Sequence, residues 1–260
     1  MEKNRVKRIS VASMFKRRKV LCFIGRTVAL SLVGCLRGQS ASVQPKGTST
    51  QIPPKTTTTT APSCMVRPQQ TEGPYFVDEK LNRSDIRSDP SDDSVKQGVP
   101  LRLVFHVSKV DGRSCTPLTG ATVDIWHCDA LGMYSDVTDP SFSTVGKKFL
   151  RGYQMTDTNG TVKFVTIYPG WYQGRTVHIH FKIRTDSASG RGYEFTSQLY
   201  FDDSLTAQVH TQPPYNAKGQ RTLKNDRDRI FQEQGEQLMV QLSKDAEGYV
   251  GTFDIGLEIA

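Results

Sequence analysis

Short segments in which apolar and polar residues alternate recur from residue 101 onward in this 260-residue chain, and they constrain its fold more than any other feature. The clearest covers residues 101–110, LRLVFHVSKV, and others cover residues 121–126, 161–167, 177–184, 194–201 and 248–257. A period of two residues buries one face of a strand. Helical periodicity is confined to residues 204–210 and 225–242. The sequence predicts a mainly β fold: an antiparallel β-sandwich with long loops and one or two short helices.

Turn residues separate these segments. Asp157-Thr158-Asn159-Gly160 is the strongest such signal, and it predicts a hairpin between the strands on either side.

The basic charge of the chain is concentrated at its beginning. Nine of the 34 Lys and Arg residues and one of the 26 Asp and Glu residues lie within residues 1–35, which leaves 25 of each sign in the remainder. A remainder with no basic surplus gives no electrostatic reason to expect a nucleic-acid partner. The excess charge indicates targeting instead.

Residues 1–35 read as a signal peptide. A basic region precedes an apolar run at 20–34, which Arg26 interrupts and which is too short for a membrane-spanning helix. KRRKVL at 16–21 resembles a twin-arginine export signal, and LVGC at 32–35 resembles a bacterial lipobox. We therefore expect export to the periplasm or the extracellular space. Lipidation of Cys35 with membrane anchoring, cleavage without a lipid, and an uncleaved disordered N-terminus stay open as alternatives.

A disordered linker and a globular domain follow. Residues 36–63 are rich in Ser, Thr, Gln and Pro and cannot bury a core, whereas residues 64–260 have globular composition. Cys64, Cys115 and Cys128 predict one disulfide and one buried free thiol in an oxidising compartment. Pairing of Cys64 with Cys115 is preferred because both lie in loop-like sequence, and the pairing stays open.

The sequence His178-Ile179-His180 carries the chemistry. On a strand both imidazoles leave one face, while Val177, Ile179 and Phe181 face the other way. Tyr172 lies six residues before the first histidine. Imidazole suits iron, copper, zinc or nickel, and a phenolate favours a ferric ion. The alternative is two polar residues on the wet face of a half-exposed strand.

Three motifs in order extend this pattern: VDIWHCDALGMY at 123–134, TIYPGWYQGRTVHIHFK at 166–182 and SQLYF at 197–201. Together they resemble the intradiol ring-cleavage dioxygenases, the family of protocatechuate 3,4-dioxygenase and catechol 1,2-dioxygenase, over residues 71–201. The chain resembles an exported single-chain branch of that family. The resemblance implies one non-haem Fe(III) per chain, with Tyr134, Tyr172, His178 and His180 as ligands. Tyr168 is the rival to Tyr172, but it precedes the Pro-Gly turn and is expected to pack at a strand end.

The resemblance also implies an activity. It implies that both atoms of O2 enter a catechol-type diol, whose ring opens between the hydroxylated carbons to a muconate-type diacid. Catechol, protocatechuate, hydroxyquinol and lignin-type fragments are the candidate substrates, and the oligomeric state stays open. Tyr172 matches the tyrosine that the family releases when substrate binds.

The resemblance assigns further residues around the metal. Arg175 matches an active-site arginine that stabilises charge on the ring, and Gln198 matches a glutamine beside the iron. Gly73, Pro74 and Tyr75 match the segment that borders the substrate pocket.

The other histidines and tyrosines show no ligand spacing. His106 and His127 are expected to be hydrogen-bonded strand histidines, and His210 is expected to be exposed. The remaining tyrosines, namely Tyr153, Tyr193 and Tyr200, are expected in the core or on the surface.

Two other functions compete with the dioxygenase. One is an exported β-sandwich that binds aromatic or metal ligands without turnover. The other is a ferrous oxygenase that uses His178, His180 and a carboxylate, Asp202 or Asp203.

Overall fold

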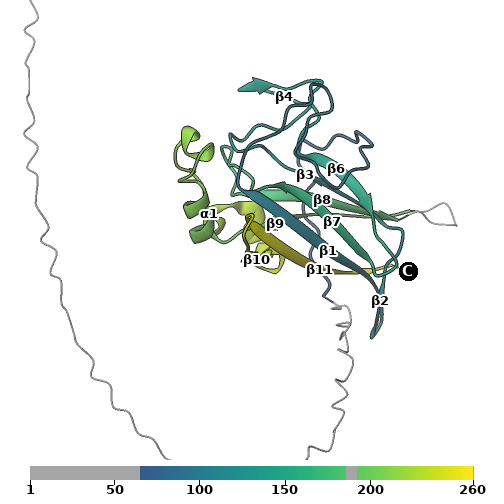
Figure 1. Cartoon of the computed structure of the whole chain (residues 1–260). Helices are drawn as coiled ribbons and strands as arrows, with labels where there is room; N and C mark the ends of the chain where they lie inside the picture. Colours follow the sequence, from purple (N-terminus) through teal and green to yellow (C-terminus); the bar gives the residue numbers. More distant parts are fainter. Residues whose placement is uncertain (1–64, 186–191, 260) are drawn as a thin grey trace, which may run out of the picture. The chain divides into compact units, whose positions relative to one another are not determined.

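The computed structural model of the chain describes residues 65–185 and 192–259 (Figure 1). The expected signal peptide, the expected linker and Cys64 lie outside the described residues. Within those two described ranges, no helix is long and apolar enough to cross a membrane.

A five-stranded sheet is built around its longest strand, β1. Its strands are β1 (Pro100–Asp111), β2 (Ser114–Pro117), β7 (Thr161–Ile167), β10 (Gln241–Lys244) and β11 (Tyr249–Glu258). β1 pairs antiparallel with β2 and β7 on one side and parallel with β11 on the other. The β1–β11 pair is the one departure from the expected antiparallel pairing in this sheet.

A second sheet has four strands in the order β6, β3, β8, β9, and all its pairs are antiparallel. Their bounds are β3 (Thr122–Trp126), β6 (Arg151–Met155), β8 (His178–Thr185) and β9 (Tyr193–Tyr200). β8 is therefore an interior strand with a partner on each side. Two short strands, β4 (Thr138–Asp139) and β5 (Phe142–Ser143), pair with each other outside both sheets.

The two sheets pack face to face through aromatic and aliphatic side chains. The Phe105 ring of β1 lies 5.5 Å from the Phe181 ring of β8 and 5.9 Å from Phe253 of β11, measured between centroids. All three side chains are at most 2% exposed. The prediction of a mainly β sandwich is confirmed, and burying the alternate residues of each strand is what holds the layers together.

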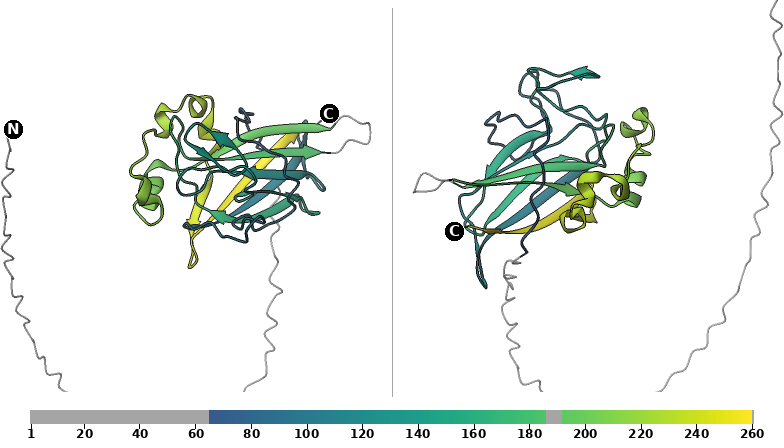
Figure 2. Two further views of the ribbon diagram at one scale, coloured as in Figure 1. Left: turned by 90° about the horizontal axis from the view of Figure 1, so that it is seen from above. Right: turned by 180° about the vertical axis from the view of Figure 1, so that it is seen from behind.

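Helical segments gather at one end of the strands, beside α1, in all three views (Figures 1 and 2). The helix expected at residues 204–210 is α1 (Asp203–Val209), with Asp202 as its N-cap. The other helical segments are η1 (Tyr215–Lys218), η2 (Asn225–Arg227), α2 (Arg229–Gln232) and η3 (Gly235–Leu238).

The prediction of one long helix over residues 225–242 is wrong. Asp228 has extended backbone angles and caps α2, and Gln234 adopts a left-handed conformation that ends the helical path. The chain then enters strand β10. Local capping and the docking of this segment on the sheets override a helical periodicity that spans these turns.

The turn at 157–160 forms as expected, with the Gly160 amide donating to the Asp157 carbonyl (2.9 Å). It does not close a hairpin, because β6 and β7 belong to different sheets. The turn instead carries the chain from one layer of the sandwich to the other.

The cysteine prediction is tested only in part. Cys128 is a buried free thiol, as expected, and Cys115 is partly exposed. These two cysteines are not bonded to each other. A bond from Cys115 to Cys64 lies outside the described residues.

Candidate metal centre

The register of β8 places its two histidines on an interior strand of the second sheet, at the end where β8 begins. His180 lies opposite Trp126 of β3 and Gln198 of β9, and His178 lies opposite Tyr200 of β9. The alternate residues of β8 point into the hydrophobic core. The two imidazoles therefore share the outer face of the sheet, as the period of two predicts.

That outer face is not wet. His178 and His180 are only 2% and 1% exposed. The His180 ring is stacked on Trp126, with centroids 5.0 Å apart and planes 7° apart. The alternative of two solvated strand histidines is wrong, because loops and the segment that contains Gly73 cover them.

Tyr134 and Tyr172 reach the histidines from two separate loops. Tyr134 follows β3, and Tyr172 precedes β8. The loops touch at Gly132, which has φ +81° and where a Cβ would lie 2.2 Å from the Trp171 carbonyl oxygen. A residue without a side chain is required at that contact, and the contact brings the two phenol rings to within 5.6 Å.

The four side chains converge on one point. The His178 and His180 Nε2 atoms are 3.0 Å apart, and the Tyr172 hydroxyl lies 3.3 Å from the His178 Nε2. The Tyr134 ring centroid lies 6.3 Å from that of His180, and the Tyr134 hydroxyl is buried with no hydrogen-bond partner among the described residues. An orphaned buried hydroxyl costs free energy unless something binds it.

Electrostatics keep both imidazoles neutral. Burial, followed by the charge of Arg175, holds the pKa of His178 well below its usual value, and burial with the neighbouring His178 does the same for the pKa of His180. The Nδ1 of His178 lies 2.7 Å from the Thr176 carbonyl oxygen, which can only accept. Nδ1 therefore carries the proton, and Nε2 presents its lone pair to the centre.

The phenols need a cation to ionise. Burial raises the pKa of Tyr172 to about 12, although Arg175 opposes the shift. Burial, and then the nearby Tyr172, raises the pKa of Tyr134 well above its ordinary value. Burial thus favours the neutral phenols. A bound metal ion would instead favour the phenolates, because metal ligands bind in their deprotonated form.

This donor set fits a ferric ion. Imidazole nitrogens bind first-row ions at about 2.0–2.1 Å, so two of them at a right angle around one ion lie about 3 Å apart, as the Nε2 atoms do here. In residues 65–185 and 192–259, no group of three or more His, Cys, Asp and Glu side chains could hold a metal. The centre thus depends on its two phenols, and oxygen donors of that kind favour Fe(III).

The carboxylates that a ferrous oxygenase would need as ligands lie away from the two histidines. Asp202 accepts from the Leu205 amide at the start of α1 (2.8 Å), and Asp203 is paired with Arg221. Neither joins the two histidines, so the structure does not support that alternative.

Arg175 and Gln198 lie against the centre, as expected. The Arg175 Nη1 is 3.4 Å from the His178 Nε2, and its Nη2 donates to the Gln198 Oε1 (2.7 Å). The Arg175 Nε donates to Asp228 (2.8 Å), a residue that sequence reasoning missed.

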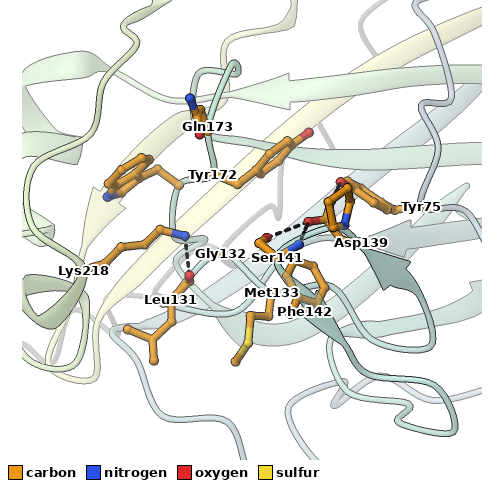
Figure 3. Close-up of a pocket in the computed structure, with 12 residues that line it drawn as sticks. Tyr75, Leu131, Gly132, Met133, Asp139, Ser141, Phe142, Tyr172, Gln173 and Lys218 are labelled. Carbon is orange, nitrogen blue, oxygen red and sulfur yellow. Dashed lines mark hydrogen bonds between the residues drawn. The ribbon is translucent and has the colours of Figure 1, made fainter.

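A cavity of about 660 Å3 opens over Tyr172 (Figure 3). Tyr75 and Asp139 lie on one side of it and Lys218 on the other. The Tyr75 hydroxyl donates to Asp139 (2.7 Å), and the Tyr75 ring stacks on Tyr134 with centroids 4.5 Å apart. A cavity of this size is ordinary for a small-molecule site.

The three residues expected to border the pocket take different positions. Tyr75 lines the cavity. Gly73 has φ +74° and lies against the metal centre, since a Cβ there would be 3.2 Å from the His180 Cε1. Pro74 is exposed and is not among the residues lining the cavity.

Other histidine and tyrosine predictions have mixed outcomes. His127 is buried and bonded to Thr166 (2.7 Å), and His106 is paired with Asp254, both as expected. Tyr168 packs at the end of β7, fully buried. The prediction that His210 is exposed is wrong. Its side chain is 8% exposed, donates to the Pro169 carbonyl (3.1 Å) and stacks on a tyrosine of η1.

Comparison with known proteins agrees with this geometry. A family model described as "Dioxygenase" matches residues 71–220, more than half of the chain. An intradiol ring-cleavage dioxygenase from Tetranychus urticae superposes with a TM-score of 0.64 at 32% identity, over 75% of this chain and 95% of that one. The dioxygenase domain of a carbohydrate-binding fusion from Streptomyces sp. SirexAA-E superposes with a TM-score of 0.52 at 31% identity, over 75% and 100%.

Among curated proteins, the protocatechuate 3,4-dioxygenase beta chain of Burkholderia cepacia is 31% identical over 137 residues, which is 49% of this chain and 56% of that relative. The chain thus spans about half the length of the curated relatives it matches. The extent of the family match and the similarity to the Tetranychus urticae structure show that this chain belongs to the intradiol ring-cleavage dioxygenase family.

Proposed function

We propose that the chain is a ferric-iron-dependent intradiol dioxygenase. It inserts both atoms of O2 into a catechol-type diol and opens the ring between the two hydroxylated carbons, giving a muconate-type diacid. The observation that carries this proposal is the convergence of the buried Tyr134 phenol, the partly buried Tyr172 phenol and two neutral imidazoles beside a cavity that Tyr172 lines.

Tyr134, Tyr172, His178 and His180 would hold the ion. A bound ferric ion supplies Lewis acidity that polarises the diol. Two phenolates offset most of its charge, and two neutral imidazoles add no charge of their own. Family membership supports iron as the metal.

The chain's own residues then divide the remaining work. Tyr172 lines the cavity, whereas Tyr134 is only 1% exposed, so the Tyr172 oxygen is the ligand atom placed to accept a proton from an entering diol. Arg175 stays charged at any working pH and faces the same point, where it stabilises negative charge that develops on the ring. Tyr75 forms a wall for the ring of the substrate.

The same cavity supports the proposed substrate class. Its lining combines apolar surface from Leu131 and Trp171 with a few polar groups, which suits an aromatic ring. The relatives are named for action on protocatechuate, catechol and chlorocatechol. We propose a catechol-type diol on this basis, with the ring substituent to be determined by assay.

The decisive experiment is aerobic incubation of the iron-loaded chain with catechol, protocatechuate, hydroxyquinol and chlorocatechol under 18O2. We expect a product heavier by two labelled oxygen atoms, with the ring opened between the hydroxylated carbons. Cleavage beside those carbons would reject the intradiol assignment. A coloured, iron-loaded protein that binds catechols but releases no product would support the alternative of an exported binding protein.

We also propose that the chain is exported, on the strength of its basic and apolar N-terminal sequence. Expression of the full chain in a bacterium, followed by fractionation and intact-mass measurement, tests this. Cleavage before Cys35 with an added lipid mass supports an anchor, and cleavage without a lipid supports a free exported enzyme. A full-length cytoplasmic product would contradict export.

A further inference from the structure

Asp228 contacts Arg175, a neighbour of the metal centre, from outside the region that the family model matches, which ends at residue 220. It follows the 3-10 helix η2 and is 1% exposed. Its carboxylate is paired with the Arg175 guanidinium, whose side chain is 14% exposed. A buried ion pair of this kind is retained only where its geometry is well defined.

Each Asp228 oxygen has a separate set of partners. Oδ1 accepts from the Ile230 and Phe231 amides (2.8 and 3.0 Å) and caps α2. Oδ2 accepts from the Arg175 Nε (2.8 Å) and the Thr176 amide (2.7 Å). One oxygen therefore stabilises the helix, and the other holds the loop before β8.

The guanidinium of Arg175 is consequently fixed at two points. Asp228 accepts from Nε on one side, and Gln198 accepts from Nη2 on the other. The third nitrogen, Nη1, is then left facing the His178 Nε2 at 3.4 Å. A planar guanidinium held by two acceptors can only point its remaining nitrogen in one direction.

We propose that Asp228 is a positioning residue of this site. It holds the Arg175 guanidinium toward the substrate position, and it acts on the reaction through Arg175 rather than through the metal. This inference rests on the proposed ring-opening function.

The test compares the wild type with Arg175→Ala, Asp228→Asn and the double variant. Asparagine keeps one oxygen to cap α2 and places an NH2 group against the Arg175 Nε, donor against donor. Should that variant fail to fold, Asp228→Ser also keeps a capping oxygen and also lacks the carboxylate. Asp202→Asn is the matched control, since Asp202 caps α1 with the Leu205 amide and forms no ion pair with an arginine among the described residues.

We measure kcat and KM with catechol, the visible tyrosinate-to-iron band of each iron-loaded variant, and the spectral change on anaerobic addition of catechol. Misplacement of a catalytic group by about 1 Å can cost about 100-fold in rate. We expect Asp228→Asn to lower kcat by roughly tenfold to 100-fold, close to the loss in Arg175→Ala. Catechol affinity should change by less than about threefold, and the iron band should be unchanged.

The double variant decides the pathway. If Asp228 acts through Arg175, the double variant is no slower than Arg175→Ala alone, and Asp202→Asn matches the wild type. An unchanged kcat in Asp228→Asn, an additional loss in the double variant, or loss of the iron band overturns the positioning role. A wild type that opens no ring overturns the proposed function itself, and that result is visible without any variant.

Discussion

At the scale of single residues, we propose that the buried hydroxyl of Tyr134 binds the metal ion. This hydroxyl is buried with no hydrogen-bond partner among the described residues, so Tyr134 contributes to the fold mainly through its ring. Tyr134→Phe should keep the fold, lose much of the visible band and lower iron affinity by at least about tenfold, since even outer partners of metal ligands cost that much. Visible spectra and iron competition dialysis measure both effects.

Tyr168→Phe is the matched control for that variant. Tyr168 is fully buried too, but its hydroxyl is bonded to Thr206 (2.6 Å) away from the centre. Iron-loaded Tyr168→Phe should therefore keep the visible band of the wild type. Equal iron bands in Tyr134→Phe and the wild type would remove Tyr134 from the ligand set.

Gly73 supports a second prediction, because its backbone and its surroundings both exclude a side chain. Gly73→Ala strains a φ of +74° and presses a Cβ against His180. We expect the free energy of unfolding to fall by about 1–3 kcal/mol, with a shifted iron band. Gly120 has a similar φ of +77° and open space around it. Gly120→Ala should therefore show the destabilisation without the band shift, and identical spectra for the two variants would argue against the His180 contact.

Among the elements, the loop after β3 links the two sheets through one histidine. His127 is joined to Thr166 of β7, in the opposite sheet, and burial lowers the pKa of His127 to about 4. In the unfolded chain the His127 side chain is protonated below about pH 6.5, whereas in the folded chain it stays neutral down to about pH 4. Stability is therefore complete above about pH 6.5 and falls as the pH drops toward 4, by about 3 kcal/mol for this group.

Urea unfolding of the iron-free protein at pH 7 and pH 4.5 tests this dependence. Buried His178 and His180 act in the same direction, so the comparison is with His127→Gln, which retains them. The variant should lose about 1–3 kcal/mol less than the wild type between the two pH values. Equal losses would show that His127 does not resist protonation.

Element boundaries also show what the sequence could and could not predict. The six strands predicted from alternation all form, because strands that turn every second residue to the core carry a period that local reading detects. The convergence of Tyr134 with His178 was predicted from motif resemblance, since the loop contact at Gly132 joins segments about 40 residues apart. Asp228 was missed because residues 225–242 read as one helix, which hid a capping aspartate inside it.

At the scale of the whole molecule, residues 36–63 are rich in Ser, Thr, Gln and Pro and residues 1–35 are expected to be a signal peptide, so we expect neither segment to contribute to the core. Removing residues 1–63 should leave the free energy of unfolding within about 0.5 kcal/mol of the full chain, with the iron band intact. Removing residues 1–76 is the control, because it also takes away Gly73 and Tyr75. A similar loss of stability in both deletions would show that residues 1–63 contribute to the fold.

The parallel pairing of β1 with β11 has a consequence for synthesis on the ribosome. β1 ends at Asp111 and its partner at Glu258, so its full edge emerges well before the strand that covers it. At about 5–20 residues per second, that delay is on the order of ten seconds. During that interval the edge of β1 lacks the partner that covers it in the fold, and we expect translation speed and holding chaperones to influence the yield of this protein.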